Sequence, residues 1–261
     1  MKDLFFIPAI KMKYSVTFWL ILISILALPF FLALGISNIA DTKIGDFTTA
    51  FETFFFYPNV WQNICWIVYI SNYFISFLLI LHVTDDNRYN LIRHHVITGW
   101  SRIQVLQSYF YVCLIFSCLV LIQVVILGAY FGIRDAYETE FITYSKILLL
   151  LCFFLQSFIR FQITIMIALF FRTATPAILA LILWNFALEP LLAWIFSQLT
   201  GFDISQYLPL GAIRALIPNL HIENFGLTSD GTIPIFAIAL GILYMIAFGL
   251  GTWHKFKHSD L

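Results

Sequence analysis

The segment WQNICWIVYISNYFISFLLILHV (Trp61–Val83) and the polar stretch after it, TDDNRYNLIRHHVITGWSRIQ (Thr84–Gln104), decide the fold. The first has no Asp, Glu, Lys or Arg, and it is long enough for a membrane-spanning helix, which needs about 20 mostly apolar residues. A second apolar run, Val105–Gly132, begins directly after the polar stretch. We therefore predict two membrane spans joined by a short polar connection.

The rest of the chain repeats this pattern of long apolar runs. Of its 261 residues, 61% are hydrophobic and 11% are charged, with a mean hydropathy of +0.92. Soluble domains have about 25% charged residues, so we expect an integral membrane protein. The predicted spans are Tyr14–Ile36, Trp61–Val83, Val105–Gly132, Tyr144–Phe171, Pro176–Leu199 and Ile233–Trp253. The predicted fold is all-α, with a single membrane domain over residues 1–261.

Lys and Arg residues in the connections predict the orientation, because cytoplasmic connections carry more of them. With a cytoplasmic N-terminus, the inner side would contain Lys2, Lys11, Lys13, Arg88, Arg93, Arg102, Arg172, Lys255 and Lys257. The outer side would contain Lys43, Arg134, Lys146 and Arg214. This excess predicts that both termini are cytoplasmic, in a multi-pass protein of the cell (inner, cytoplasmic) membrane. The formal net charge of +0 sums two oppositely biased sides, so no nucleic-acid partner is expected.

The polar connection after Val83 has the pattern of a short amphipathic helix. Asp85 and Asp86 are suited to cap a helix N-terminus, and Gly99 is a natural helix terminator. Between them, one face is formed at helical spacing by Tyr89, Ile92 and Val96. We expect a rigid helix from Asp86 to Ile97 that carries a push from a soluble partner into both flanking spans. The alternative is an ordinary positively charged connector without a docking role.

Two charged residues fall near the middle of predicted spans. Arg160 lies in the fourth span and Glu189 in the fifth. A lone charge at that depth costs at least about 2.5–3.5 kcal/mol, so we expect an Arg160–Glu189 ion pair with Gln156 and Asn185 beside it. The pair would either lock two helices together or form a polar patch on a transport path. Pro190 is expected to kink the fifth span, because it lacks a backbone donor.

The connection before the last span contains YLPLGAIRALIPNL, which is too apolar for a free loop and too short to span the membrane. We expect a short helix at, or dipping into, the outer leaflet. The residues of this outer hairpin that we single out are Leu208, Pro209 and Arg214.

Three motifs give the chain a resemblance to the permease subunits of type-2 ABC exporters, in particular the six-span lantibiotic and bacitracin-type kind. Between spans two and three stand Asp85-Asp86, Arg88 and Gly99-Trp100-Ser101-Arg102, where that family has an acidic residue, a basic or Thr-bearing helix and a Gly-x-Ser-Arg motif. Phe171-Arg172-Thr173 matches at the junction of spans four and five, and Tyr207-Leu208-Pro209 matches in the outer hairpin. The usual Glu before the helix is Asp here.

The resemblance implies that the helix from Asp86 to Ile97 is a coupling helix seated in a groove of a separate ATP-binding subunit. The residues implied in that contact are Asp85, Asp86, Arg88, Tyr89, Ile92, Arg93, Val96, Gly99 and Arg102. That subunit must be another chain, because no GxxxxGK[ST] phosphate loop occurs in this one. The resemblance implies two copies of it, which would bind ATP and Mg. A second permease chain, identical or different, is also implied. The chain itself is expected to hold no cofactor, metal or catalytic residue.

Other functions weighed against this one are a secondary transporter and a membrane scaffold subunit. A secondary transporter usually has paired helix breaks in its two halves, and we identify a Pro break in the fifth span without a partner break in the other half. An enzyme is disfavoured because HExxH and GxSxG motifs are absent. The 29 Phe residues suggest an amphipathic, peptide or lipid-like cargo, although lipid-facing packing explains them as well.

Overall fold

The computed structural model describes residues 16–41, 54–55, 59–89, 91–134, 144–202, 204–217 and 235–257. The predicted all-α membrane fold is confirmed, since the described residues contain six helices long and apolar enough to cross a membrane. The elements are α2 (Val16–Asp41), α4 (Val60–Arg88), α5 (Leu91–Ile97), α6 (Arg102–Arg134), α7 (Tyr144–Phe171), α8 (Ala174–Leu183), η1 (Trp184–Leu188), α9 (Glu189–Thr200), η2 (Ser205–Tyr207), α10 (Pro209–Arg214) and α11 (Ile235–Lys257).

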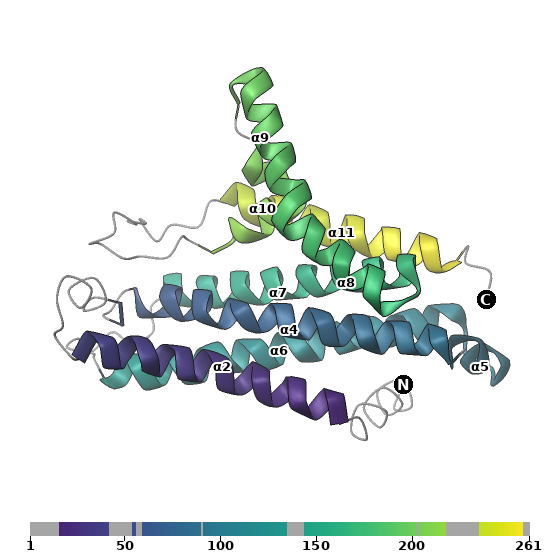
Figure 1. The fold of residues 1–261 in the computed structure, drawn as a ribbon, viewed down its shortest axis with the longest axis horizontal. Helices are drawn as coiled ribbons and strands as arrows, with labels where there is room; N and C mark the ends of the chain where they lie inside the picture. Colours follow the sequence, from purple (N-terminus) through teal and green to yellow (C-terminus); the bar gives the residue numbers. More distant parts are fainter. Residues whose placement is uncertain are drawn as a thin grey trace.

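Four spans lie side by side as a bundle, and α4 is its centre. It packs against α2, α6 and α7, while α11 covers the other side of α7 (Figure 1). The most apolar window of α4 is 67% buried, against 17% for the α8–η1–α9 span. α2 begins, and α11 ends, at the end of the bundle where α5 lies (Figure 1). The start of the first span and the end of the last lie at the same end, as expected when the number of spans is even.

Polar side chains join the spans inside this apolar core. On α4, Ser71 donates to the carbonyl oxygen of Ile25 in α2, at 3.0 Å. One residue on, Asn72 donates to the hydroxyl of Ser157 in α7, at 3.1 Å. Small polar residues of this kind let membrane helices approach and hydrogen-bond where apolar packing gives little preference. They hold α2 and α7 to opposite sides of α4.

The fifth span differs from the others in direction and in hydrogen bonding. It runs obliquely across the bundle, and its α9 end stands away from the four packed helices (Figure 1). At its middle lies a π-helix, Trp184–Leu188, with the backbone N–H of Glu189 bonded to the carbonyl of Trp184. Pro190 follows directly and cannot donate a backbone hydrogen bond. The predicted irregularity at Pro190 thus takes the form of a π-helix on its N-terminal side.

Candidate docking element and intramembrane polar cluster

The short helix between spans two and three forms, but it begins later than expected. α4 continues through Asp85, Asp86 and Arg88, and α5 starts only at Leu91. The two aspartates therefore do not cap α5; they belong to the last turn of α4. The prediction that this helix starts at Asp86 is wrong, and the prediction that it ends at Ile97 is correct.

Asp86 fixes the end of α4 to α6. Its carboxylate is buried and accepts a hydrogen bond from the Tyr109 hydroxyl at 2.9 Å. His82, one turn earlier on α4, brings its Nε2 to 4.0 Å from the same carboxylate oxygen, and its ring stands edge-on to Tyr109. A carboxylate in this position needs such partners, because burying a charge without hydrogen bonds is costly. The sequence pattern did not single out Tyr109 or His82.

The connection from α5 into α6 is also closely defined. Gly99 has a φ of +100°, a conformation that suits glycine and strains other residues. Ser101 and Gln104 then form a reciprocal capping box, in which the Ser101 N–H donates to Gln104 Oε1 at 2.8 Å. In return, the Gln104 N–H donates to Ser101 Oγ at 3.3 Å. The backbone path from α5 into α6 is therefore set by local chemistry.

α5 presents one face to the core and another to the outside. Ile92 is buried with 3% of its side chain exposed, whereas Arg93 and His94 are exposed. Tyr89 and Ile97 are 64% and 75% exposed. The remaining members of the predicted set are Arg88 and Arg102, both exposed, and Val96, whose side chain lies outside the described residues. The outcome is a short helix that is anchored through Ile92 and has exposed basic and apolar side chains among its described residues.

The second candidate site lies in the membrane interior around Arg160 of α7. This residue is 1% exposed, and its guanidinium carbon lies 4.0 Å from the ring centre of Tyr73 and 5.0 Å from that of Tyr69. Its Nη1 donates to the Tyr69 hydroxyl. The partners of Arg160 are thus two tyrosines of α4, an arrangement in which a cation gains from the faces of aromatic rings.

Glu189 has hydrogen-bond partners of its own. Its carboxylate accepts a hydrogen bond from the backbone N–H of Gly211 in α10, at 2.6 Å, and one from the Trp184 indole, at 3.2 Å. The expected Arg160–Glu189 ion pair does not form in this structure. Asn185, expected beside the pair, donates instead to the Tyr73 hydroxyl at 2.8 Å.

The contact to Glu189 brings the outer hairpin to the middle of the fifth span. Pro209 begins α10, with Leu208 as its N-cap, and the helix packs against α7 and α11. The predicted short helix is therefore present, and its place at, or dipping into, the outer leaflet stays a prediction. Arg214, the third residue predicted there, is exposed, and its Nε donates to the Leu210 carbonyl at 3.4 Å.

Several residues of this cluster were missed at the level of sequence. Tyr69, Tyr73 and Trp184 were counted only as apolar span residues. One signal was available, because Tyr and Trp in membrane helices usually lie at the interfaces, whereas these stand inside a span. Gly211 had no signal, since its role depends on its backbone N–H.

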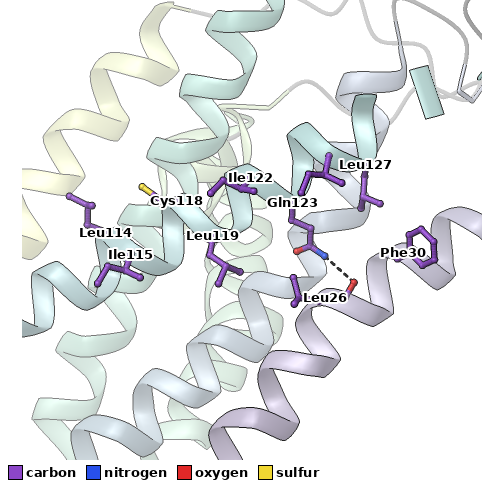
Figure 2. A pocket seen from close by; sticks show the side chains of 10 residues that line it. Leu26, Phe30, Leu114, Ile115, Cys118, Leu119, Ile122, Gln123 and Leu127 are labelled. Carbon is purple, nitrogen blue, oxygen red and sulfur yellow. Dashed lines mark hydrogen bonds between the residues drawn. The ribbon is translucent and has the colours of Figure 1, made fainter. Parts of the chain in front are cut away.

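An apolar groove of about 540 Å³ lies between α2 and α6 (Figure 2). Its lining residues are Leu26, Phe30, Leu114, Ile115, Cys118, Leu119, Ile122, Gln123, Ile126 and Leu127. The Gln123 amide donates to the carbonyl oxygen of Ile25, at 2.8 Å. It also reaches the carbonyl oxygen of Leu26, at 3.4 Å, which is the bond drawn in Figure 2. Its polar group is therefore already bonded, and the groove offers apolar contact only.

No protein-family model, curated protein or solved structure matches this chain. The chain is an all-α, multi-pass membrane protein with six helices of spanning length among its described residues. The similarity to ABC permeases rests on the three motifs alone.

Proposed function

We propose that this membrane protein is the permease subunit of an ATP-driven ABC exporter. A separate ATP-binding subunit, in two copies, would bind ATP and Mg, and a second permease chain would complete the assembly. The cargo would be an amphipathic peptide or a lipid-like molecule.

The observation that carries this proposal is the form of α5. It is a short helix between two long spans, and its neighbours in space are α4 and α6. Ile92 of α5 is buried, while Arg93 and Ile97 of the same helix are exposed, and so is Tyr89, which lies just before it. Exposed apolar and basic groups on a well-fixed helix are suited to bind a groove of a soluble partner. An ordinary connector needs neither the anchor nor the fixed geometry.

A push on α5 has a continuous set of contacts through which to act. The Asp86–Tyr109 hydrogen bond joins α4 to α6 beside α5. Further along α4, Tyr73 holds Asn185 of the π-helix. One turn on, Glu189 holds the backbone of Gly211 in α10. Closure of the ATPases would move α4 and α6 and, through these contacts, shift α10 at the opposite side of the membrane.

The test is co-purification from the native membrane. The tagged chain is expected to bring with it a chain that has a GxxxxGK[ST] sequence and hydrolyses ATP. Arg88→Glu and Tyr89→Ala are expected to release that chain while the permease stays folded, because both side chains are exposed at the end of α4, just before α5 begins. Arg172→Glu is the matched control, since Arg172 is exposed in the turn between α7 and α8, at the α5 end of the bundle (Figure 1).

Retention of the ATPase by both α5 variants would place the docking elsewhere. A chain that never brings an ATP-hydrolysing partner, although it is intact and membrane-embedded, would contradict the exporter and favour a secondary transporter or a scaffold subunit.

A further inference from the structure

Arg160 has a free hydrogen-bonding edge in the interior of the protein. Within the part of the chain that the structure describes, its Nε and Nη2 have no hydrogen-bond partner, although the residue is 1% exposed. The rings of Tyr69 and Tyr73 lie against the guanidinium, and Nη1 is used by the Tyr69 hydroxyl. What remains is one side of the guanidinium, with two N–H groups that point the same way.

This free edge has the geometry that binds an oxyanion. The Nε–H and Nη2–H groups of arginine are parallel donors that match two oxygens of one carboxylate or phosphate group. A cation in a membrane interior gains most from such a partner, because it is removed from water. Glu189 does not supply it, since its carboxylate is bonded to Gly211 and Trp184.

The neighbouring side chains add further polar groups without a partner. Gln156 stands one helical turn before Arg160 on α7, and its Oε1 is buried and unbonded. Asn72, which bonds Ser157 of α7 through its nitrogen, has an unbonded Oδ1. Buried polar atoms are normally paired. The two amide oxygens accept hydrogen bonds and would take a ligand hydroxyl or N–H, so the donors available to an oxyanion here are those of Arg160.

Tyr73 forms the cover of this place. Its ring lies 4.0 Å from the Arg160 guanidinium carbon, and on the other side it stacks with Phe186 of the π-helix, at 6.1 Å between ring centres. Phe186 is exposed and Tyr73 is half-buried. For a ligand to reach Arg160 from the side of Phe186, the Tyr73 ring would have to move and give up its hydrogen bond from Asn185.

We propose that the free edge of Arg160 binds the oxyanion head, carboxylate or phosphate, of an amphiphile that enters from the membrane beside Tyr73. This inference does not depend on the exporter assignment. Any protein with this arrangement would bind such a ligand, whether or not an ATPase drives it.

The experiment measures thermal unfolding of the purified full chain in dodecyl maltoside, a neutral detergent. The probes are dodecanoate, dodecyl phosphate and dodecanol, which share one tail. A ligand that binds only the folded state raises the unfolding temperature with its concentration. We expect at least one of the two anions to raise it, and dodecanol to leave it unchanged.

Three variants test the residue. Arg160→Lys keeps the charge but lacks the paired donors, and it is expected to weaken binding of the anion by about tenfold or more. Arg160→Met is expected to abolish binding. Arg172→Lys, at an exposed arginine, is the matched control and should bind as the native chain does.

The two anionic probes distinguish the sources of the ligand. A response to dodecyl phosphate alone indicates a phospholipid head group, and a response to dodecanoate alone indicates a fatty acid or a peptide carboxylate; both support the site. The proposal is overturned if neither anion acts differently from dodecanol, or if Arg160→Lys responds like the native chain. Should the Arg160 variants not fold, a photoreactive dodecanoate on the native chain decides. Its adduct should lie near Arg160 or Tyr73, and an adduct elsewhere contradicts the proposal.

Discussion

The carboxylate of Asp86 is buried at the end of a membrane helix and receives its hydrogen bond from a different helix. The bond joins two elements that the α5 connection also joins. Its removal should therefore loosen that end of the bundle without changing the apolar packing, because phenylalanine fills nearly the same volume as tyrosine.

Tyr109→Phe is expected to destabilise the chain by about 1.5–3 kcal/mol, the range for hydrogen bonds to charged groups. Thermal unfolding in detergent measures it, and hydrogen exchange should rise in α5. Tyr130→Phe is the control, because Tyr130 is exposed and its hydroxyl makes no hydrogen bond in the described part of the chain. An equal effect of both substitutions would mean that the Asp86 contact contributes nothing.

Gly211 is the second residue at which a single atom, here the absent Cβ, decides how two elements pack. A Cβ built at this position would lie 1.8 Å from the carbonyl oxygen of Ser205, which is far inside van der Waals contact. Because Gly211 has no side chain, α10 can pack closely against the η2 turn. In this position the Gly211 N–H donates a hydrogen bond to Glu189.

Gly211→Ala is expected to cost about 1–3 kcal/mol, as overpacking does, and to separate α10 from Glu189. Thermal unfolding gives the loss, and a cysteine placed at Leu210, which is buried, should become reactive. Gly249→Ala is the matched control, since nothing lies within 4 Å of its added Cβ. A Gly211→Ala chain as stable as the control would contradict the close packing of α10.

At the scale of elements, the turn between α7 and α8 is short and strained. Arg172 has a φ of +58°, in the left-handed region that costs residues other than glycine about 1–2 kcal/mol. Its N–H still bonds to the carbonyl of Ala168 at 3.1 Å, which ends α7 in the usual left-handed way.

Replacing Arg172 by Gly and by Ala separates backbone from side chain. Both substitutions remove the guanidinium, but only Gly relieves the left-handed conformation. Arg172→Gly is therefore expected to be more stable than Arg172→Ala by about 1 kcal/mol. Denaturation of the two purified variants side by side measures the difference. If the Ala variant were the more stable, the left-handed turn would not be the conformation in the membrane.

The helices themselves were largely predictable from sequence, and the contacts between them were not. Long apolar runs predicted α7 with its observed bounds and the fifth span within a few residues, because length and hydropathy are local properties. The predicted start of α5 was wrong because α4 continues through Asp86. The hydrogen-bond donor to Asp86, Tyr109, lies on another helix, α6. No local pattern contains that information.

The pairing of Arg160 with Glu189 failed for a related reason. Counting residues gives the depth of a side chain in the membrane, but the face it points to depends on every turn before it. The π-helix at Trp184–Leu188 has more residues per turn than an α-helix, so it rotates Glu189 away from the direction that regular α-helix geometry predicts. In the structure Tyr73 contacts the Arg160 guanidinium and accepts a hydrogen bond from Asn185, while Glu189 binds Gly211 and Trp184.

At the scale of the whole molecule, the placement of α5 and of the outer hairpin on opposite sides of the membrane is a prediction with a direct test. A cysteine at Ile97, which is 75% exposed, should react with an impermeant maleimide only after the membrane is opened. A cysteine at Gln206, exposed in η2, should react in intact cells. Of the native cysteines, Cys65, Cys113 and Cys152 are buried and Cys118 is half-buried, so background labelling should be low. Labelling of both positions from one side would invalidate the orientation.

The central claim is that α5 binds a separate ATPase, and site-specific photo-crosslinking from Ile97 tests it most directly. A photoreactive residue at this exposed position is predicted to form an adduct, in native membranes, with a chain that contains a phosphate loop and binds ATP. The same residue at Ile122, exposed on the apolar side of α6, should give no such adduct. If Ile97 yields no ATP-binding chain, or Ile122 yields it equally, the docking role of α5 is contradicted.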